Sequence, residues 1–280
     1  CVNGAMVDLS QYEYFHKTSP TVRLESLSTL INVGALERRN FSTMDVAGAY
    51  LHSHLEVPHT IIVDRAMAAT FVRLRPDWAQ YLRHDGTMYM VLDKALYGLP
   101  ESSVQWWKEI KSTLTELGYR SDPCEPCVFQ KTKNGKTNTL AIHVDDIFGA
   151  SQSEELIVEL YDAIKAKYGS PTIHRDDVLP YLGMGISQPS SDGSCAVQMQ
   201  QYTKKVLDEF GTTDKASSPT VDDFFVQDKS SPDTNPSEFL SLLMKLMYLA
   251  LRTRPDILLP LAHLSTFCKR PKHQHLQQLH

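Results

Sequence analysis

The feature that most constrains the fold of this 280-residue chain is a pair of adjacent carboxylates, Asp145 and Asp146, set between two apolar segments. The residues before the pair are typical of a strand, and Ile147 and Phe148 follow it directly. This order predicts a hairpin with both carboxylates at its tip, where strand alternation sends their side chains to opposite sides. Adjacent like charges are unfavourable unless water or cations neutralise them.

The acidic pair alone has two interpretations. An ordinary Asp-Asp turn is the commoner one. The functional alternative is a divalent-metal site, because hard cations such as Mg²⁺ take carboxylate oxygens and two-metal sites stabilise both the attacking and the leaving oxygen of a displacement. Asp45 is a second candidate, since it ends an apolar segment and is followed by Gly48, Ala49 and Tyr50. By itself it is equally typical of an aspartate at the core edge beside a buried tyrosine.

The hydrophobic pattern mixes helical and strand periods without a regular βαβ repeat, which favours an α+β fold. We expect helices over 19–40, 102–117, 151–168, 202–210, 237–252 and 258–268, and strands at 128–130, 139–144, 181–187 and 196–199. Residues 41–50 predict a short strand that runs into a turn or helix. Asn134-Gly135 predicts a hairpin turn. Ser151 and Glu154 predict a capping box, and the proline-rich stretch 217–236 predicts a linker.

Composition excludes several classes of protein. With 42% hydrophobic and 22% charged residues, the chain has an ordinary globular composition. No apolar run reaches the roughly 18 residues that a membrane helix needs, so no membrane partner is expected. No signal peptide is visible, and the start at Cys1 suggests a fragment or a processed piece. The five cysteines suit a reducing compartment, and the pair Cys124 and Cys127 is more typical of plain thiols than of a zinc or redox site.

Charge is unevenly distributed along the chain. The formal net charge is -5, yet the segment from residue 252 onward contains five Lys and Arg residues and only one acidic residue, Asp256. Such a tail could contact phosphates, or it could be a solvated basic terminus. Charge alone does not separate these alternatives.

The acidic features together resemble a known family. D-x-x-x-A-Y at 45–50 and V-D-D at 144–146 resemble the first and third palm motifs of reverse transcriptases. Six further segments resemble the copia/Ty group of long-terminal-repeat retrotransposons, in the order that group has them: V-R-L-E-S at 22–26, K-A-L-Y-G-L at 94–99 with W-W at 106–107, D-P-C and P-C-V-F between 122 and 129, Y-L-G-M at 181–184, M-Y-L at 247–249 and T-R-P-D-I at 253–257.

The resemblance implies a right-hand polymerase whose palm is an antiparallel sheet backed by helices. It places partial fingers at 1–40, palm with the first catalytic motif at 41–60, fingers at 61–100, palm with the catalytic hairpin at 101–200, and thumb and connection at 201–280. We expect no RNase H domain within the chain. The basic strand that the family has in its fingers is expected to precede Cys1.

The resemblance also implies a set of site residues. Asp45, Asp145 and Asp146 would hold two Mg²⁺ ions, for which Mn²⁺ could substitute, with Asp45 and Asp145 as the closer pair of ligands. Tyr50 would stack beneath the incoming sugar and exclude a 2′-hydroxyl. The backbone amides of four residues would face the triphosphate: Val46, Ala47, Gly48 and Ala49. A loop against the nucleotide and template would consist of Leu99, Pro100 and Glu101, where the family often has Lys-Gln in place of Pro-Glu.

The remaining positions are assigned more loosely. His143 stands where many members have tyrosine. Candidates for protonating the pyrophosphate are Lys165, Lys167 and His174, although each is more typical of a solvated residue. The phosphates of the nucleic acid would meet the basic tail: Arg252, Arg254, Lys269, Arg270 and Lys272.

The implied activity is RNA-directed DNA polymerisation on a primed RNA or DNA template, with deoxynucleotide triphosphates as substrates. The RNase H and integrase regions of the same Pol polyprotein would be partners. The expected location is a cytoplasmic virus-like particle with access to the nucleus. One alternative is a catalytically incompetent remnant that only binds nucleic acid. The other is a metal-dependent hydrolase using the same aspartates, which explains no other matched segment.

Overall fold

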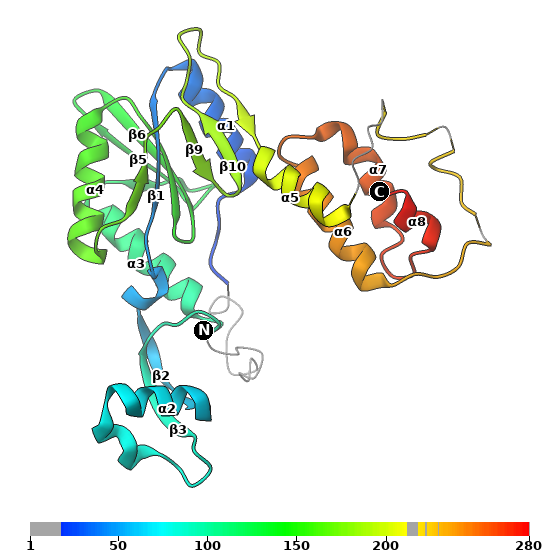
Figure 1. Ribbon diagram of the computed structural model, residues 1–280. Coiled ribbons are helices and arrows are strands. Elements are labelled where there is room, and N and C mark those ends of the chain that lie inside the picture. The colour runs from blue at the N-terminus through cyan, green and yellow to red at the C-terminus, as the bar shows by residue number, and fades with distance from the viewer. Residues whose placement is uncertain (1–17, 212–217, 222, 229, 280) are drawn as a thin grey trace. The chain divides into compact units, whose positions relative to one another are not determined.

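A computed structural model describes residues 18–211, 218–221, 223–228 and 230–279 (Figure 1). The chain divides into two compact units, Cys1–Asp177 with Gln188–Cys195 and Val178–Ser187 with Ala196–His280. Of the expected partial fingers at 1–40, residues 1–17 lie outside the described residues, and residues 18–40 are described. No helix in the described part of the chain is long and apolar enough to cross a membrane.

A six-stranded antiparallel sheet forms the centre of the first unit. Its strand order is β4 (Arg120–Ser121), β5 (Val128–Lys133), β6 (Lys136–His143), β7 (Asp146–Ser151), β1 (Asn40–Asp45) and β8 (Thr172–His174). Consecutive strands β4 to β7 pair as hairpins, and β1 inserts between β7 and β8. The expected α+β class, with an antiparallel sheet and helices, is confirmed.

Helices cover the two faces of this sheet differently. Helices α3 (Ser102–Glu116) and α4 (Glu154–Tyr168) pack on one face, where Met44 and Ile147 join their buried side chains in one cluster. Helix α1 (Leu24–Leu36) packs on the other face. There Gly34 leaves room for the ring of Phe41, and this ring meets the ring of Phe148 edge-on, with centroids 5.2 Å apart.

The strand alternation also places the aspartates. Because alternate residues of a strand point to opposite faces, Asp45 and Asp146 lie on the face that carries α1.

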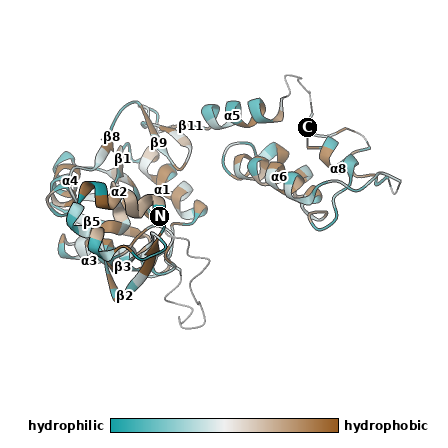
Figure 2. Ribbon diagram, turned by 60° about the horizontal axis from the view of Figure 1, so that its bottom comes forward, coloured by the Kyte–Doolittle hydropathy of each residue, from teal (hydrophilic) through white to brown (hydrophobic). Residues whose placement is uncertain are grey.

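A smaller lobe of the first unit is built on a two-stranded ribbon. Strands β2 (His54–Val63) and β3 (Met88–Lys94) pair antiparallel, and hydrophobic residues run along both (Figure 2). Helix α2 (Arg65–Leu74) covers one side, where Val63, Ala68 and Met88 are buried together. The lobe also contains the 3₁₀ turn η5 (Pro76–Tyr81). The 3₁₀ turn η4 (Ala49–His52) precedes the lobe, and its Ala49 is buried in the cluster of the central sheet. Of these elements, only η4 lies where a turn or helix is expected from the sequence. The others are not predicted, because the short apolar runs here have no clear period.

The second unit joins a three-stranded sheet to a helical cluster. Strands β9 (Val178–Tyr181), β10 (Met184–Ser187) and β11 (Val197–Gln198) are followed by α5 (Gln200–Phe210), α6 (Pro236–Ala250), η6 (Pro255–Ile257), α7 (Leu258–Ser265) and α8 (His273–Gln277). Phe239, Leu243 and Leu264 lie in its hydrophobic core. The Tyr248 hydroxyl donates a hydrogen bond of 2.6 Å to the Leu182 carbonyl and so ties α6 to the β9–β10 turn.

Several local predictions need correction. The predicted strand 181–187 is two strands joined at Leu182 and Gly183, whose φ values of 48° and 74° make a tight turn that the apolar sequence hides. Ser151 ends β7 and accepts a hydrogen bond from the Ser153 amide, so α4 begins at Glu154 without the predicted capping box. Asn40 begins β1 and does not end α1.

Other expectations hold. Asn134 and Gly135 form the predicted turn, with φ of 53° and 74°. The expected linker 217–236 lies partly outside the described residues. Its end is held by a β-bridge between Asp233 and Lys272.

Candidate active site at the end of the central sheet

Strand pairing brings two of the candidate carboxylates together. Asp45 is the last residue of β1 and stands directly opposite Asp146, the first residue of β7. Directly opposite residues on antiparallel strands have Cβ atoms about 4.5–5.5 Å apart and share a sheet face. Both side chains are therefore presented at one end of the sheet, on the face of α1.

Asp145 lies in the turn that precedes β7. His143 pairs with Asp146, which leaves Val144 and Asp145 as a two-residue hairpin loop. The Val144 carbonyl accepts a hydrogen bond of 2.7 Å from the indole Nε1 of Trp106, and the Asp145 carbonyl accepts one of 3.2 Å from the Val46 amide. The backbone of the turn is therefore held by α3 on one side and by the chain after β1 on the other.

The three carboxylates interact through their charges. Burial, and then the charge of Asp145, raises the pKa of Asp45. Burial also raises the pKa of Asp146, with further contributions from Asp145 and Asp45 that His143 partly opposes. These shifts mark a crowded anionic site in which removing a proton is costly.

The donor chemistry of this site suits a hard divalent cation. Three carboxylates whose repulsion a cation would relieve are the oxygen ligands that Mg²⁺ prefers. Within the described residues, no three acidic, histidine or cysteine side chains stand as a ready metal-binding group. The carboxylates fit the cation by their chemistry and charge.

Two tyrosines line the site. The rings of Tyr50 and Tyr97 meet with centroids 4.4 Å apart. Burial and the charge of Asp145 raise the pKa of both hydroxyls, and a hydrogen bond between Tyr97 and Asp145 adds to the shift of Tyr97. Tyr97 lies within the K-A-L-Y-G-L motif but is not among the site residues that the resemblance implies. Its position in that motif, immediately before Gly98, is the only signal that could have marked it.

The expected triphosphate-facing backbone requires one correction. The Val46 amide donates to the Asp145 carbonyl, so it is not available to a triphosphate. Val46 and Ala49 are buried, whereas Ala47 is exposed. Gly48, with φ of 65°, adopts a left-handed conformation that lets the chain turn from β1 into η4.

The expected nucleotide loop at 99–101 is packed against the lobe. Leu99 and Glu101 are each only 6% exposed, and Pro100 is half-buried. Glu101 forms an ion pair with His59 of β2, which the sequence analysis missed. Since their side chains are used inside the fold, we no longer expect Leu99 and Glu101 to contact a nucleotide through them.

The three candidate proton donors lie in different places. Lys167 pairs with Glu109 at 2.9 Å, between α4 and α3, and Lys165 lies over the ring of Tyr161 at 5.8 Å. His174 of β8 stands opposite Thr43, two residues before Asp45, so alternation puts it on the aspartate face. The Nδ1 atom of His174 is 3.9 Å from Asp176.

Three of the five basic residues expected to contact phosphates are engaged within the second unit. Arg254 pairs with Asp256 at 2.7 Å, and the Arg252 guanidinium lies 3.5 Å from the ring centre of Tyr248. Lys272 donates to the Ser231 carbonyl at 3.0 Å. Lys269 and Arg270 are exposed.

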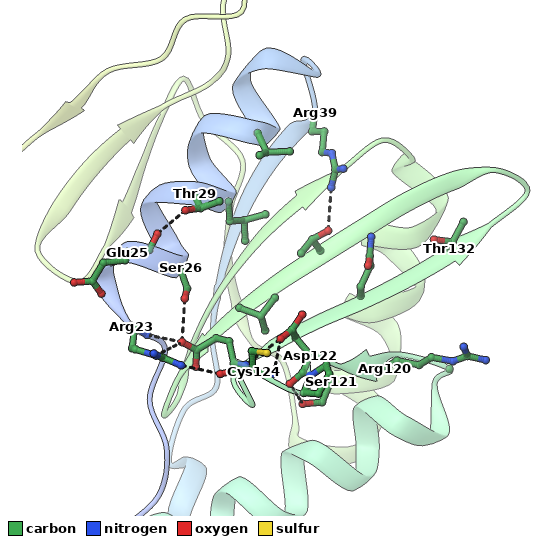
Figure 3. Close-up of a pocket in the computed structure, with 18 residues that line it drawn as sticks. Arg23, Glu25, Ser26, Thr29, Arg39, Arg120, Ser121, Asp122, Cys124 and Thr132 are labelled. Atoms are coloured by element: carbon green, nitrogen blue, oxygen red, sulfur yellow. Dashed lines mark hydrogen bonds and ion pairs between the residues drawn. The ribbon is translucent and has the colours of Figure 1, made fainter.

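A cavity of about 980 Å³ lies beside α1 on the same sheet face as Asp45, over β4 and β5 (Figure 3). Its polar groups bind one another: Glu125 accepts hydrogen bonds from Arg23 and Ser26, and Arg39 donates to Thr139. These contacts tie the start of α1 to the turn before β5. The hydrogen bonds around the cavity therefore stabilise the packing of α1. Asp45, Asp145 and Asp146 do not line the cavity.

The C-x-x-C pair consists of free thiols. Cys124 is exposed and Cys127 is buried. Burial raises the pKa of Cys127 to about 12, which keeps it protonated. This favours the interpretation as plain thiols.

Comparisons with known proteins reveal distant relatives. The chain is 24% identical over 269 residues to the Retrovirus-related Pol polyprotein from transposon TNT 1-94 of Nicotiana tabacum, covering 92% of this chain and 19% of that protein. It is 26% identical over 240 residues to the putative transposon Ty5-1 protein of Saccharomyces cerevisiae, covering 84% and 72%. The Retrovirus-related Pol polyprotein from transposon RE1 of Arabidopsis thaliana is 24% identical over 275 residues, covering 95% and 17%.

The chain thus spans only about a fifth of the tobacco protein. Among solved structures, it is similar to a foamy viral protease-reverse transcriptase in complex with double-stranded DNA. The TM-score is 0.46 at 14% identity, over 94% of this chain and 38% of that one. The family described as Reverse transcriptase (RNA-dependent DNA polymerase) matches residues 1–221. With most of its length matched, the chain belongs to the reverse transcriptase family.

Proposed function

We propose that this chain catalyses template-directed transfer of a deoxynucleotide to a primer 3′-hydroxyl, as an RNA-directed DNA polymerase. One observation carries the proposal beyond family membership. Asp45 and Asp146 stand opposite each other at the paired ends of β1 and β7, with Asp145 in the adjoining turn. Two-metal nucleotidyl transfer needs carboxylates close enough to hold both ions, and this pairing supports such a site.

Asp45, Asp145 and Asp146 would hold two Mg²⁺ ions, or Mn²⁺ in their place. When bound, the ions lower the pKa of the 3′-hydroxyl and stabilise the pyrophosphate leaving group. The protein's own groups bind and orient the nucleotide. The Tyr50 ring, backed by Tyr97, closes the space in which a 2′-hydroxyl would sit, and the backbone from Ala47 to Ala49 faces the triphosphate.

The template and primer would be RNA or DNA. Their phosphates would meet the exposed cations Lys269 and Arg270 first, because Arg254 and Lys272 are already engaged within the fold. His174 is the preferred candidate for protonating the pyrophosphate. It alone of the three candidates stands on the same strand pair as Asp45.

The relatives, which include Pol polyproteins, support a proposal for the domains, partners and location of this chain. We assign palm to the central sheet with α3 and α4, fingers to the β2–β3 lobe, and thumb and connection to the second unit. RNase H and integrase regions of the same polyprotein would be partners. The complex would work in a cytoplasmic virus-like particle and enter the nucleus with its DNA product.

Primer extension on poly(rA)/oligo(dT) with dTTP and Mg²⁺ tests this function. We expect extension by the wild type and by Asp162→Asn, a matched change at an exposed aspartate of α4. Asp145→Asn should lose more than about a hundredfold, because losing even an outer partner of a metal ligand costs 10- to 100-fold. Primer binding without any extension by the wild type would favour the non-catalytic remnant.

A further inference from the structure

We propose that Trp106 is a positioning residue whose indole N–H holds the Val144 carbonyl and thereby fixes the turn that carries Asp145. The catalytic consequence rests on the proposed polymerase function. The structural part, a tryptophan that holds this turn in place, stands without it.

The turn needs an external hold because its conformation is unfavourable for its sequence. Val144 is the first of the two loop residues and has φ of 59°. A two-residue hairpin with positive φ at its first position favours glycine there, and a β-branched residue in that region is an outlier. Such strain persists only where the surrounding structure over-determines it.

Trp106 supplies a rigid hold. Its side chain is 1% exposed and its Nε1 donates to the Val144 carbonyl at 2.7 Å. The ring packs edge-on against Tyr168, with centroids 5.2 Å apart. The Tyr168 hydroxyl is in turn bonded to Glu109 at 3.2 Å and to Thr113, both on α3. The indole is thus fixed by packing on α3 and α4 and does not rely on the turn for its position.

The contacts of Asp145 show what the hold controls. The Asp145 carbonyl accepts a hydrogen bond of 3.2 Å from the amide of Val46, the residue after Asp45. Trp106 therefore holds the residue before Asp145, while the chain just after β1 holds Asp145 itself. Losing the indole N–H frees one end of the turn, and the Asp145 carboxylate is then less well placed against Asp45.

The test compares Trp106→Phe with Trp107→Phe. Both changes replace an indole by a phenyl ring at adjacent positions of α3. Trp107 does not hold the turn: its buried Nε1 has no hydrogen-bond partner among the described residues, and its ring lies 4.6 Å from Lys111. The first readout is backbone hydrogen exchange in the metal-free protein. We expect Trp106→Phe to speed exchange at 45–46 and 143–147 about tenfold or more, as the loss of a buried hydrogen bond implies, with the rest of α3 matching Trp107→Phe.

The second readout is steady-state kinetics of primer extension. We expect kcat to fall about 10- to 100-fold in Trp106→Phe, with the KM for dTTP changed less than about threefold, because the nucleotide still binds while the carboxylates are misplaced. Trp107→Phe should retain the wild-type kcat.

The outcomes separate this inference from the proposed function. Equal exchange at 143–147 in the two variants overturns the inference whatever the activity. Faster exchange with an unchanged kcat overturns its catalytic consequence. If the wild type extends no primer, the proposed function fails, and the exchange data still decide whether Trp106 holds the turn. If Trp106→Phe does not fold, β-(3-benzothienyl)alanine at 106 keeps the bicyclic shape without the N–H and receives the same two measurements.

Discussion

At the scale of single residues, the acidic site is destabilising for the fold. Asp45 and Asp146 have pKa values raised by burial and by the charge of Asp145. The folded protein therefore binds their protons more tightly than the unfolded chain does, and stability is lost as pH rises through the raised values. A site of this kind is retained for its chemistry and not for stability.

Asp145→Asn should therefore stabilise the metal-free protein at pH 7 while removing activity. The change deletes the charge that raises the pKa of both neighbours. We expect NMR titration to show lower pKa values for Asp45 and Asp146, and denaturant unfolding to give a higher free energy of unfolding. Unchanged pKa values of Asp45 and Asp146 in the variant would contradict the electrostatic effect of Asp145. The control Asp162→Asn should leave both pKa values as in wild type.

Tyr50→Val tests whether the Tyr50 ring excludes the 2′-hydroxyl of a ribonucleotide. The smaller side chain opens space beside Tyr97, so discrimination against ribonucleotides should fall at least about tenfold, equivalent to about 1.4 kcal/mol. The measurement is the ratio of kcat/KM for dTTP and UTP. Tyr89→Val, a change at an exposed ring of β3, should leave the ratio as in wild type. Equal ratios in Tyr50→Val and wild type would remove this role.

At the scale of elements, an ion pair joins the lobe to the start of α3. Glu101 directly precedes α3 and pairs with His59 of β2, and their side chains are 8% and 26% exposed. A second pair on the same ribbon, His54 with Asp93 at 3.2 Å, is 67% and 76% exposed. Burial makes the first pair the stronger link, because water screens the second.

His59→Ala should lower the free energy of unfolding by about 1–3 kcal/mol, since it leaves a buried carboxylate without its histidine. His54→Ala should cost less than about 1 kcal/mol, the range of exposed pairs. Urea unfolding of both variants checks this. Equal costs would show that burial does not distinguish the two pairs.

The elements also show how far sequence reasoning reaches. Helix α3 and the Asn134-Gly135 turn follow local patterns and were predicted. The β9–β10 turn was missed because Leu182 is an apolar residue at positive φ. That Asp45 faces Asp146 depends on the register between β1 and β7, and the contact of Trp106 with Val144 joins residues 38 positions apart. Local periodicity carries no information about either pairing, and only the family resemblance brought the aspartates together.

At the scale of the whole molecule, net charge is a poor guide to nucleic-acid contacts. The chain is acidic overall, and its basic tail is partly neutralised from within, as by Asp256 on Arg254. The sequence could locate the cations but not tell which were engaged, because those partners are set by folding.

Lys269→Ala and Arg270→Ala should each weaken primer–template binding and reduce the slope of log K against log salt by about 1, as loss of one phosphate contact does. Arg254→Ala should reduce the slope less, because its guanidinium already binds Asp256. Fluorescence anisotropy over a salt series measures all three. A larger effect from Arg254→Ala than from the two exposed cations would contradict this assignment.

The central claim is that carboxylates from two separate strands form one metal-dependent polymerase site. Asp45 is the most direct test, because it reaches the hairpin only through the β1–β7 pairing. The measurement is the single-turnover rate of dTTP incorporation on poly(rA)/oligo(dT) with Mg²⁺, together with primer–template affinity, for wild type, Asp45→Asn and Asp162→Asn. We predict unchanged affinity in all three and a rate lower by more than about a hundredfold in Asp45→Asn alone. Incorporation by Asp45→Asn at the wild-type rate would contradict the account.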